Sequence, residues 1–247
     1  MLLSHQRLFE DCVLKKDQID IWQYPLHTEL PEAESILSAN ELIRAKRFHF
    51  PKHQRRFIMA HSVLRLILAR YLEAPPHGLD FIEGKHGKPA LNNFPFLQFN
   101  LSHSGNMALL AIGTNYPLGV DVEYFSARPY IGIGQQLFSI KENKMLKDSS
   151  KSLSPLTFFN IWVQKEALIK ACGMGLSYPT QQFDVPSLAF APETIVDALH
   201  QKNWNMITFM PQVGCCAALC YDPCIQNIRY STLSMPNIVE FIENRRI

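Results

Sequence analysis

The sequence predicts a folded protein of the α+β class, with helices and strands mixed along the chain. The chain has 247 residues, 47% hydrophobic and 19% charged, which is ordinary for a globular protein and enough to bury a sizeable core. Residues 57–72 are apolar on most sides, as in a buried helix. Residues 98–122 contain short apolar segments typical of strands. The length suits one large domain or two small domains packed together.

The predicted elements follow one another without a visible internal repeat. A first helix is expected to begin near Glu32 and to continue to about residue 47. The basic segment 44–56, interrupted by Pro51, leads into the apolar helix 57–72. Strands are predicted at 81–82, 98–101, 107–112, 118–122, 204–210 and 214–220, and further helices at 139–147 and 156–172, the last ended by Gly173. Turn residues before Pro117 predict a boundary that divides the chain into 1–117 and 118–247.

Charge, hydropathy and cysteine spacing argue against several classes of protein. The net charge of +2 is too small to indicate nucleic-acid binding by itself. The N-terminal residues Met1 to Leu3 are too short for a signal-peptide core, and apolar runs such as 107–112 are too short to span a bilayer. Neighbouring side chains of Cys215 and Cys216 point to opposite faces of the predicted strand, which favours packed thiols over a zinc site. We therefore expect a soluble, cytoplasmic protein without nucleic-acid or membrane partners.

A pair of acidic residues in a predicted strand is the first candidate for chemistry. In Gly119-Val120-Asp121-Val122-Glu123, the two carboxylates share one face, about 7 Å apart, while the valines face a core. Such a strand is more often a half-exposed edge with solvated acids. Two carboxylates on one face can also bind a hard cation such as Mg²⁺, which takes oxygen ligands.

A predicted helix brings a third acid and two amines. Trp162, Glu166 and Lys170 lie on one stripe at i, i+4 and i+8, with Lys165 on its edge. The plain alternative is an amphipathic surface helix held by its tryptophan. If the helix meets the acidic strand, three carboxylates would hold a cation, and the amines would hold the phosphates of a substrate.

Two further segments suit phosphate binding. The segment Gly84-Lys85-His86-Gly87-Lys88-Pro89 lets the backbone approach a ligand closely, although a hairpin turn is its simpler interpretation. In Asn100-Leu101-Ser102-His103-Ser104-Gly105, Ser102 and His103 diverge along a strand and lack a G-x-S-x-G setting. They therefore make a poor nucleophile and base, and phosphate contact suits them better.

In their order and spacing, these segments resemble the 4′-phosphopantetheinyl transferases of the surfactin-synthetase-activating type. The matching segments are 44–56, 87–89, 99–105, 119–123, 138–142 and 162–170, within a resemblance that covers about residues 30 to 225. The resemblance implies a pseudo-dimer of two similar α+β halves with the active site between them. It implies a monomeric enzyme that transfers the phosphopantetheine arm of coenzyme A to a serine of an apo acyl or peptidyl carrier protein. It further implies that Mg²⁺, with Mn²⁺ possible in its place, is required and that adenosine 3′,5′-bisphosphate is released.

The same resemblance assigns roles to individual residues. Asp121, Glu123 and Glu166 would ligate the metal, and Glu142 matches a further acid near it. Catalytic roles fall to Glu166, Lys170 and Glu142. Contacts to coenzyme A are implied for Arg44, Arg56, Gly87, Lys88, Pro89, Ser102, His103, Lys165 and Lys170. Glu41 and Phe57 depart from the pattern, because related enzymes can carry a basic residue at the first position and a hydroxyl at the second.

Chemistry leaves several points open. Transfer of a phosphoryl-linked arm needs charge neutralisation and positioning rather than an enzyme nucleophile. Glu166, Glu142 or a metal-bound water would take the proton of the attacking serine.

The alternatives to this function are a Mg²⁺-dependent phosphohydrolase and a nucleic-acid-binding module that uses residues 44–56. Residues 124–134, expected as a loop, would either pack into the core or receive the carrier protein through Arg128, Tyr130, Ile131 or Ile133.

Overall fold

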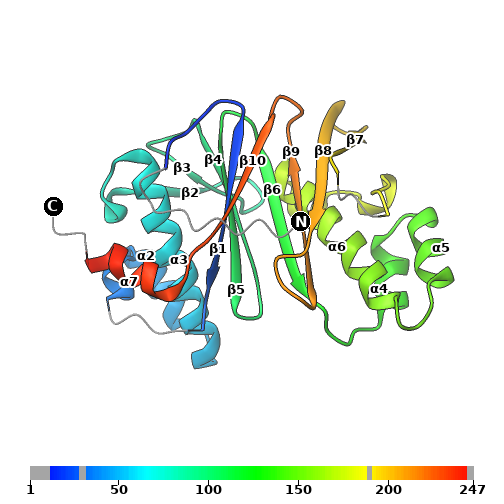
Figure 1. Ribbon diagram of the computed structural model, residues 1–247, viewed down its shortest axis with the longest axis horizontal. Helices are drawn as coiled ribbons and strands as arrows, with labels where there is room; N and C mark the ends of the chain where they lie inside the picture. Colours follow the sequence, from blue (N-terminus) through cyan, green and yellow to red (C-terminus); the bar gives the residue numbers. More distant parts are fainter. Residues whose placement is uncertain (1–11, 28–31, 188–190, 244–247) are drawn as a thin grey trace.

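Two four-stranded sheets pack face to face between two groups of helices (Figure 1). The computed structural model describes residues 12–27, 32–187 and 191–243. The first sheet has the order β10-β1-β5-β4 and the second the order β6-β9-β8-β7. Their strands are β1 (Gln18–Pro25), β4 (Leu97–Ser104), β5 (Met107–Thr114), β10 (Asn227–Thr232), β6 (Leu118–Tyr124), β7 (Glu193–Asp197), β8 (Lys202–Phe209) and β9 (Cys215–Tyr221).

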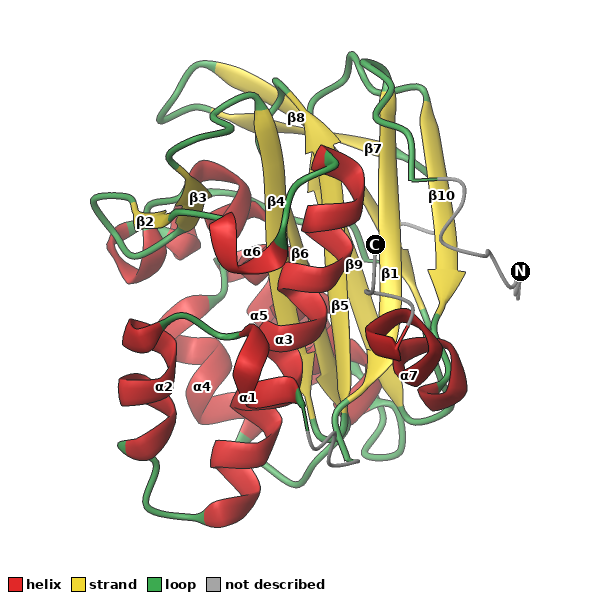
Figure 2. Cartoon of the chain, turned by 90° about the vertical axis from the view of Figure 1, so that its left-hand side faces the viewer, coloured by secondary structure: helices red, strands yellow, loops and turns green. Residues whose placement is uncertain are grey.

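Helices cover the outer face of each sheet. The first sheet carries α1 (Ala33–Ile36), α2 (Ala39–Lys46), α3 (Pro51–Leu72) and α7 (Met235–Glu243), which lie in front of it in Figure 2. The second carries α4 (Tyr130–Leu137), α5 (Ile140–Asp148) and α6 (Ser154–Cys172). A small hairpin of β2 (Phe81–Glu83) and β3 (Pro89–Leu91) and three short 3-10 turns, Pro76–Gly78, Gly175–Ser177 and Thr180–Gln182, complete the described elements. No helix in the described ranges is long and apolar enough to cross a membrane.

Strand alternation explains the layers. In β1, Ile19 and Ile21 face the second sheet, whereas Trp22 and Tyr24 pack against the helices of the first half. All residues of β5 are buried, because one face meets α3 and the other meets the second sheet. The molecule therefore has three apolar layers: one under each group of helices and one between the sheets.

The two halves repeat one topology. In each half the first strand pairs antiparallel with the last strand, and the last pairs with the strand before it: β1 with β5 and β5 with β4, then β6 with β9 and β9 with β8. Each half places a long helix, α3 or α6, on its sheet. The α+β pseudo-dimer is thus confirmed, although no repeat is visible in the sequence.

The structure corrects several predicted elements. The helix expected from Glu32 to residue 47 is two helices, because Ser38 begins a new one with a capping box to Glu41. Part of the segment expected as a loop, 124–134, belongs to α4. Strands β1, β3, β7 and β10 and helix α7 were not predicted. The helices at 140–148 and 154–172 agree with prediction, and Gly173 ends the second in the left-handed conformation.

The C-terminal segment returns to the first half. Strand β10 pairs parallel with β1, and Ile238 of α7 packs in the core beneath α3. Both elements lie within the predicted subdomain 118–247, so that range includes chain belonging to the first sheet. The boundary at residue 117 itself stays a prediction.

Candidate active site

A glycine allows the acidic strand to meet the helix. A Cβ at Gly119 would lie 2.1 Å from the carbonyl oxygen of Ala167 and 2.4 Å from the backbone nitrogen of Ala171. Only a residue without a side chain fits between β6 and α6 at this point. The close approach brings the carboxylates that follow on β6 beside the half-buried stripe of α6.

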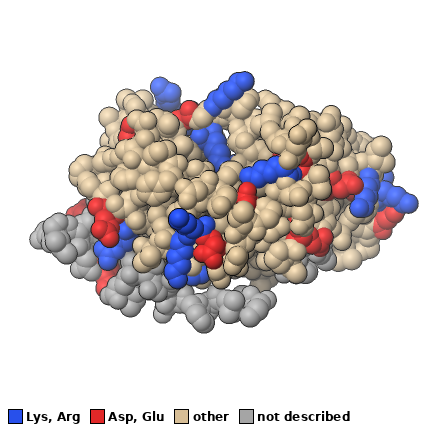
Figure 3. Space-filling model, turned by 90° about the horizontal axis from the view of Figure 1, so that it is seen from above, with Lys and Arg blue, Asp and Glu red and all other residues tan. Residues whose placement is uncertain are grey.

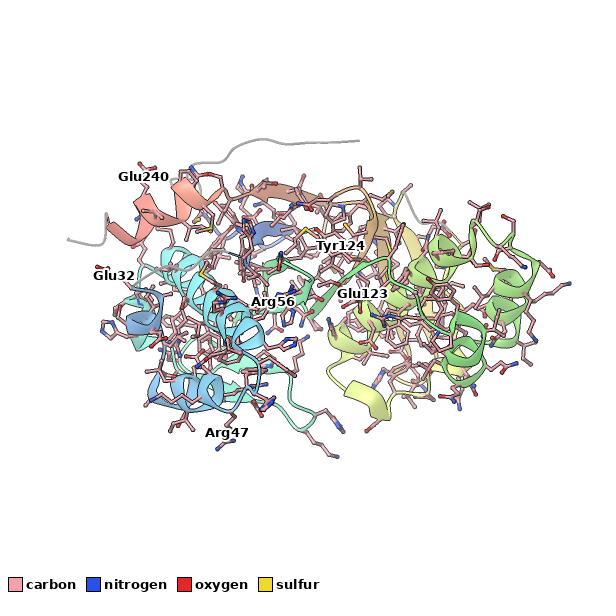
Figure 4. The ribbon with its side chains drawn as sticks, turned by 90° about the horizontal axis from the view of Figure 1, so that it is seen from below. Glu32, Arg47, Arg56, Glu123, Tyr124 and Glu240 are labelled. Carbon is pink, nitrogen blue, oxygen red and sulfur yellow. The ribbon has the colours of Figure 1, made fainter. Side chains whose placement is uncertain are left out.

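The side chains predicted from these two elements line one cavity of about 340 Å³ at the seam between the halves. Its walls are Leu101, Ser102, His103, Asp121, Glu123, Trp162, Glu166 and Lys170. The volume falls at the small end of the range for ligand pockets. In Figure 4, Glu123 of β6 and Arg56 of α3 both lie near the middle of the molecule, where the two halves meet. The structure thus joins the acidic strand, the helix stripe and the serine-histidine segment.

Asp121 is the most connected acid of the pocket. Its Oδ1 accepts hydrogen bonds from Lys170 Nζ at 2.6 Å and from Ser102 Oγ at 2.8 Å. Its Oδ2 is buried and has no hydrogen-bond partner among the described residues. A buried carboxylate oxygen without a partner is costly, so it marks a place where a ligand is expected.

The acids of the pocket repel one another. Burial, then the charge of Asp121, raises the pKa of Glu123, although Ser104, Arg128 and Lys170 act in the opposite direction. Burial raises the pKa of Glu166, with further increases from Asp121 and Glu123 that Lys170 partly offsets. Lys170 supplies one positive charge against three carboxylates, so a bound cation would relieve the excess negative charge.

The donor set fits a hard divalent cation. Carboxylate oxygens from Asp121, Glu123 and Glu166 face one cavity, and no sulfur ligand lines it. The unpartnered Oδ2 of Asp121 supplies a ligand position that the protein leaves unsatisfied. The chemistry of these residues therefore suits Mg²⁺ or Mn²⁺, and the metal itself stays a prediction.

Basic groups surround the His103 side of the pocket. Loss of hydration lowers the pKa of His103, and the charges of Lys170, His61 and Arg56 lower it further. The same positive charges would favour an anion bound beside His103. Arg56 reaches from α3 and donates two hydrogen bonds to Asn106 Oδ1, at 3.2 and 2.7 Å. Arg44 is more exposed, over the ring of Phe57 and 3.6 Å from Glu83.

Lys88 connects the hairpin turn to the second half. Its Nζ donates to the carbonyl oxygens of Leu118 at 2.9 Å and Ala171 at 3.1 Å, the latter at the C-terminal end of α6. Burial lowers its pKa to about 8. Gly87 is exposed with φ of 82°, and Pro89 begins β3. The Lys88 ammonium is thus hydrogen-bonded to backbone carbonyls at the seam between the halves. Contact of residues 87–89 with the cofactor stays a prediction.

Glu142 and Lys165 lie elsewhere. Glu142 is fully buried, accepts from the backbone of Ser139 and Val185, and pairs with Lys165 Nζ at 2.9 Å. Lys165 also donates to the carbonyl oxygens of Thr180 and Phe183. Lys165 precedes Glu166 by about 100° around the helix, so it faces the core under α5 instead of the pocket. The catalytic role expected for Glu142 and the cofactor contact expected for Lys165 therefore have no geometric support.

Two groups were missed by the sequence analysis. Ser104, quoted in the segment 100–105 without a role, donates to Glu123 Oε2 at 2.9 Å. The alternation of polar residues along that segment was the available signal. Elsewhere, one possible ligand atom each of Cys172, Asp197 and His200 lies within 4.8 Å of the other two. The Asp197 carboxylate accepts hydrogen bonds from several side chains and backbone groups, among them Tyr178 and Trp204, which indicates a hydrogen-bond centre.

The fold and the pocket define a protein with an acidic site at a seam between two similar halves, and comparison with known families identifies its class. Residues 20–115 match the family described as "4′-phosphopantetheinyl transferase, N-terminal", and residues 117–212 match the "4′-phosphopantetheinyl transferase superfamily". The chain belongs to this superfamily and is a phosphopantetheinyl transferase.

Relatives with curated names support the assignment. The chain is 32% identical over 216 residues to the 4′-phosphopantetheinyl transferase HetI of Nostoc, a match that covers 85% of this chain and 90% of that protein. It is 33% identical over 166 residues to a putative 4′-phosphopantetheinyl transferase of Synechocystis, covering 65% and 67% of the two chains. The enzyme Sfp of Bacillus subtilis is 28% identical over 152 residues, covering 61% and 66%.

Proposed function

We propose that this transferase moves the 4′-phosphopantetheine arm of coenzyme A to a serine of an apo acyl or peptidyl carrier protein and releases adenosine 3′,5′-bisphosphate. One observation carries the proposal: Asp121, Glu123, Glu166 and Lys170 face a single cavity at the seam between the halves. Such a site can neutralise a pyrophosphate and leave room for an incoming hydroxyl.

The three carboxylates would hold Mg²⁺, with Mn²⁺ as an alternative. A bound cation of this kind neutralises charge on phosphate oxygens. Lys170, fixed by Asp121 and Ser102, lies where it can donate to a pyrophosphate oxygen. His103 and Arg56 lie near each other and suit a second phosphate, with Arg44 more exposed on α2.

Glu166 is the protein group best placed to accept the proton of the attacking serine. It lines the pocket, where the incoming hydroxyl would also lie. Glu142, the other candidate, is buried against Lys165. No covalent intermediate with the enzyme is needed, because the chemistry rests on positioning and charge.

The surface beside Glu123 suits a protein acceptor. Arg128 lies 3.6 Å from Glu123 and over the ring of Phe159. Ile131 of α4 and Ile140 of α5 are 41% and 92% exposed, whereas Tyr130 and Ile133 pack against the core. We infer that the exposed isoleucines, rather than Tyr130 or Ile133, contact the carrier.

A cytoplasmic, monomeric enzyme remains part of the proposal. In the described part of the chain no disulfide is formed by Cys172, Cys215, Cys216, Cys220 or Cys224, which is consistent with a reducing compartment. On the face seen in Figure 3, basic and acidic side chains are interspersed, in keeping with the small net charge. Gel filtration tests the oligomeric state.

Incubation with coenzyme A, Mg²⁺ and an apo carrier protein, followed by mass measurement of the carrier, tests the function. The expected result is a carrier heavier by one phosphopantetheine group with the wild type and an unmodified carrier with Asp121→Asn. A phosphohydrolase would instead release phosphate from its substrate without the carrier. A nucleic-acid-binding module would modify nothing and retain labelled DNA or RNA.

A further inference from the structure

Side chains of β4 close the free edge of β6. Strand β6 pairs with β9 on one side only, and its other edge faces the first sheet. There, Asn100 Oδ1 accepts from Val120 N at 2.8 Å, and Ser102 Oγ accepts from Val122 N at 3.3 Å. Ser104 Oγ accepts from the next amide of the edge, that of Tyr124, at 3.0 Å. These side chains satisfy every second amide of the strand, which are successive amides of this edge, so the two halves join without a backbone ladder.

The two serines also direct the carboxylates of β6. Ser102 Oγ donates to Asp121 at 2.8 Å, and Ser104 Oγ donates to Glu123 at 2.9 Å. Each hydroxyl accepts from one backbone N–H of β6 and donates to the carboxylate of the β6 residue that precedes this N–H. Because a hydroxyl has a single proton, the bond to the amide leaves that proton for the carboxylate.

Asn100 makes the contact to a backbone amide of β6 without the contact to a carboxylate. Its amide oxygen accepts from Val120 N, and the residue before Val120 is Gly119, which has no carboxylate. Strand β4 therefore contains a residue that supports the seam alone and two that support the seam and an acid. This difference separates a structural role from a role in the site.

We propose that Ser104 is a positioning residue that holds Glu123 in the orientation needed to bind the divalent cation, a proposal that rests on the proposed function. Glu123 has a competing partner, since Arg128 Nη2 lies 3.6 Å from the same Oε2 that Ser104 holds. The Glu123 side chain is 21% exposed, which leaves it room to turn toward the arginine. Loss of the hydroxyl would release the carboxylate to Arg128 and weaken the cation site.

Cation binding without coenzyme A gives a readout independent of turnover. Titration calorimetry with MgCl₂, and electron paramagnetic resonance with MnCl₂, would be applied to wild type, Ser104→Ala, Ser104→Thr and Asn100→Ala. We expect Ser104→Ala to raise the dissociation constant about 10-fold, as for other partners of metal ligands. Ser104→Thr retains the hydroxyl and should bind like the wild type. Asn100→Ala should lower the melting temperature with the dissociation constant within about twofold.

Transfer assays separate positioning from general damage. Activity of Ser104→Ala should recover as Mg²⁺ is raised, with kcat little changed, and adding Arg128→Gln to Ser104→Ala should restore part of the cation affinity. Unchanged affinity in Ser104→Ala, or an equal loss in Asn100→Ala, would overturn the proposal. Should Ser104→Ala fail to fold, Ser104→Cys, similar in size but a weaker donor, takes its place. Wild type that neither binds a cation nor modifies a carrier would refute the proposed function itself.

Discussion

Lys170 Nζ on α6 lies 2.6 Å from Oδ1 of Asp121 on β6, so the helix and the acidic strand are joined by an ion pair inside the pocket. The contact holds the amine at the cavity and partly offsets the negative charge of the three carboxylates. It also places Lys170 within 3.0 Å of Ser102 on β4, which brings elements of both halves to one point.

Replacement of Lys170 should slow the chemical step more than it weakens binding. We expect Lys170→Ala to lower kcat by about 100-fold, as when one donor to a developing charge is removed. Arg44→Gln, at the outer side, should mainly raise KM for coenzyme A. Kinetics with coenzyme A and dephospho-coenzyme A measure both effects. Equal affinity of the wild type for the two donors would exclude recognition of the 3′-phosphate by Arg44 or Arg56.

The buried pair of Glu142 and Lys165 should act through stability. Glu142→Gln or Lys165→Met leaves a buried charge without its partner, and we expect a loss of about 3–5 kcal/mol in the free energy of unfolding. Urea denaturation measures this, with Lys144→Met on the exposed face of α5 as the control. A Glu142→Gln enzyme that folds normally yet transfers nothing would instead support a catalytic glutamate.

A methyl group at residue 119 should push α6 away from β6. Because the added Cβ would meet backbone atoms rather than a flexible side chain, Gly119→Ala should cost on the order of 3 kcal/mol or more and lower activity. Gly132→Ala is the matched control, since nothing lies within 4 Å of a Cβ there. Normal stability and activity of Gly119→Ala would show that the seam can open without consequence.

The metal-free protein should gain stability from Glu123 and Glu166 as the pH falls. Both have pKa values raised above the ordinary 4.5, so the folded state binds their protons more tightly than the unfolded state. Their contribution is full below about pH 4.5 and is lost as the pH rises through the folded pKa. Comparing urea unfolding of wild type and Glu123→Gln/Glu166→Gln across this window isolates the effect. Saturating Mg²⁺ should reverse the slope, because the cation favours the ionised carboxylates.

The exposed side chain of Ile131 should affect only the protein substrate. We expect Ile131→Ser to raise KM for the carrier about 10-fold and to leave KM for coenzyme A unchanged. Ile133→Ser is the comparison, because Ile133 packs against the core and its change should lower the melting temperature instead. A parallel rise of both KM values in Ile131→Ser would contradict carrier docking at α4.

Local periodicity determined much of the site in advance. Strand alternation placed Asp121 and Glu123 on one face, and the 3.6-residue repeat placed Glu166 and Lys170 on one stripe. These relationships depend only on backbone geometry within one element. The α+β character was predictable for the same reason, since the longer helices and apolar strands are strongly periodic.

Tertiary packing decided the rest. The sequence did not reveal that Glu142 and Lys165 satisfy each other in the core, or that Lys88 reaches the end of α6, because these contacts join residues far apart along the chain. It gave no sign that β10 returns to pair with β1. Periodicity states which side of its own element a residue occupies, whereas the partner on that side is fixed only when the elements pack. For that reason the sequence by itself determined that Asp121 and Glu123 share one face of β6. Only the packing of the two halves decided that Ser102 holds the first of these acids and Ser104 the second.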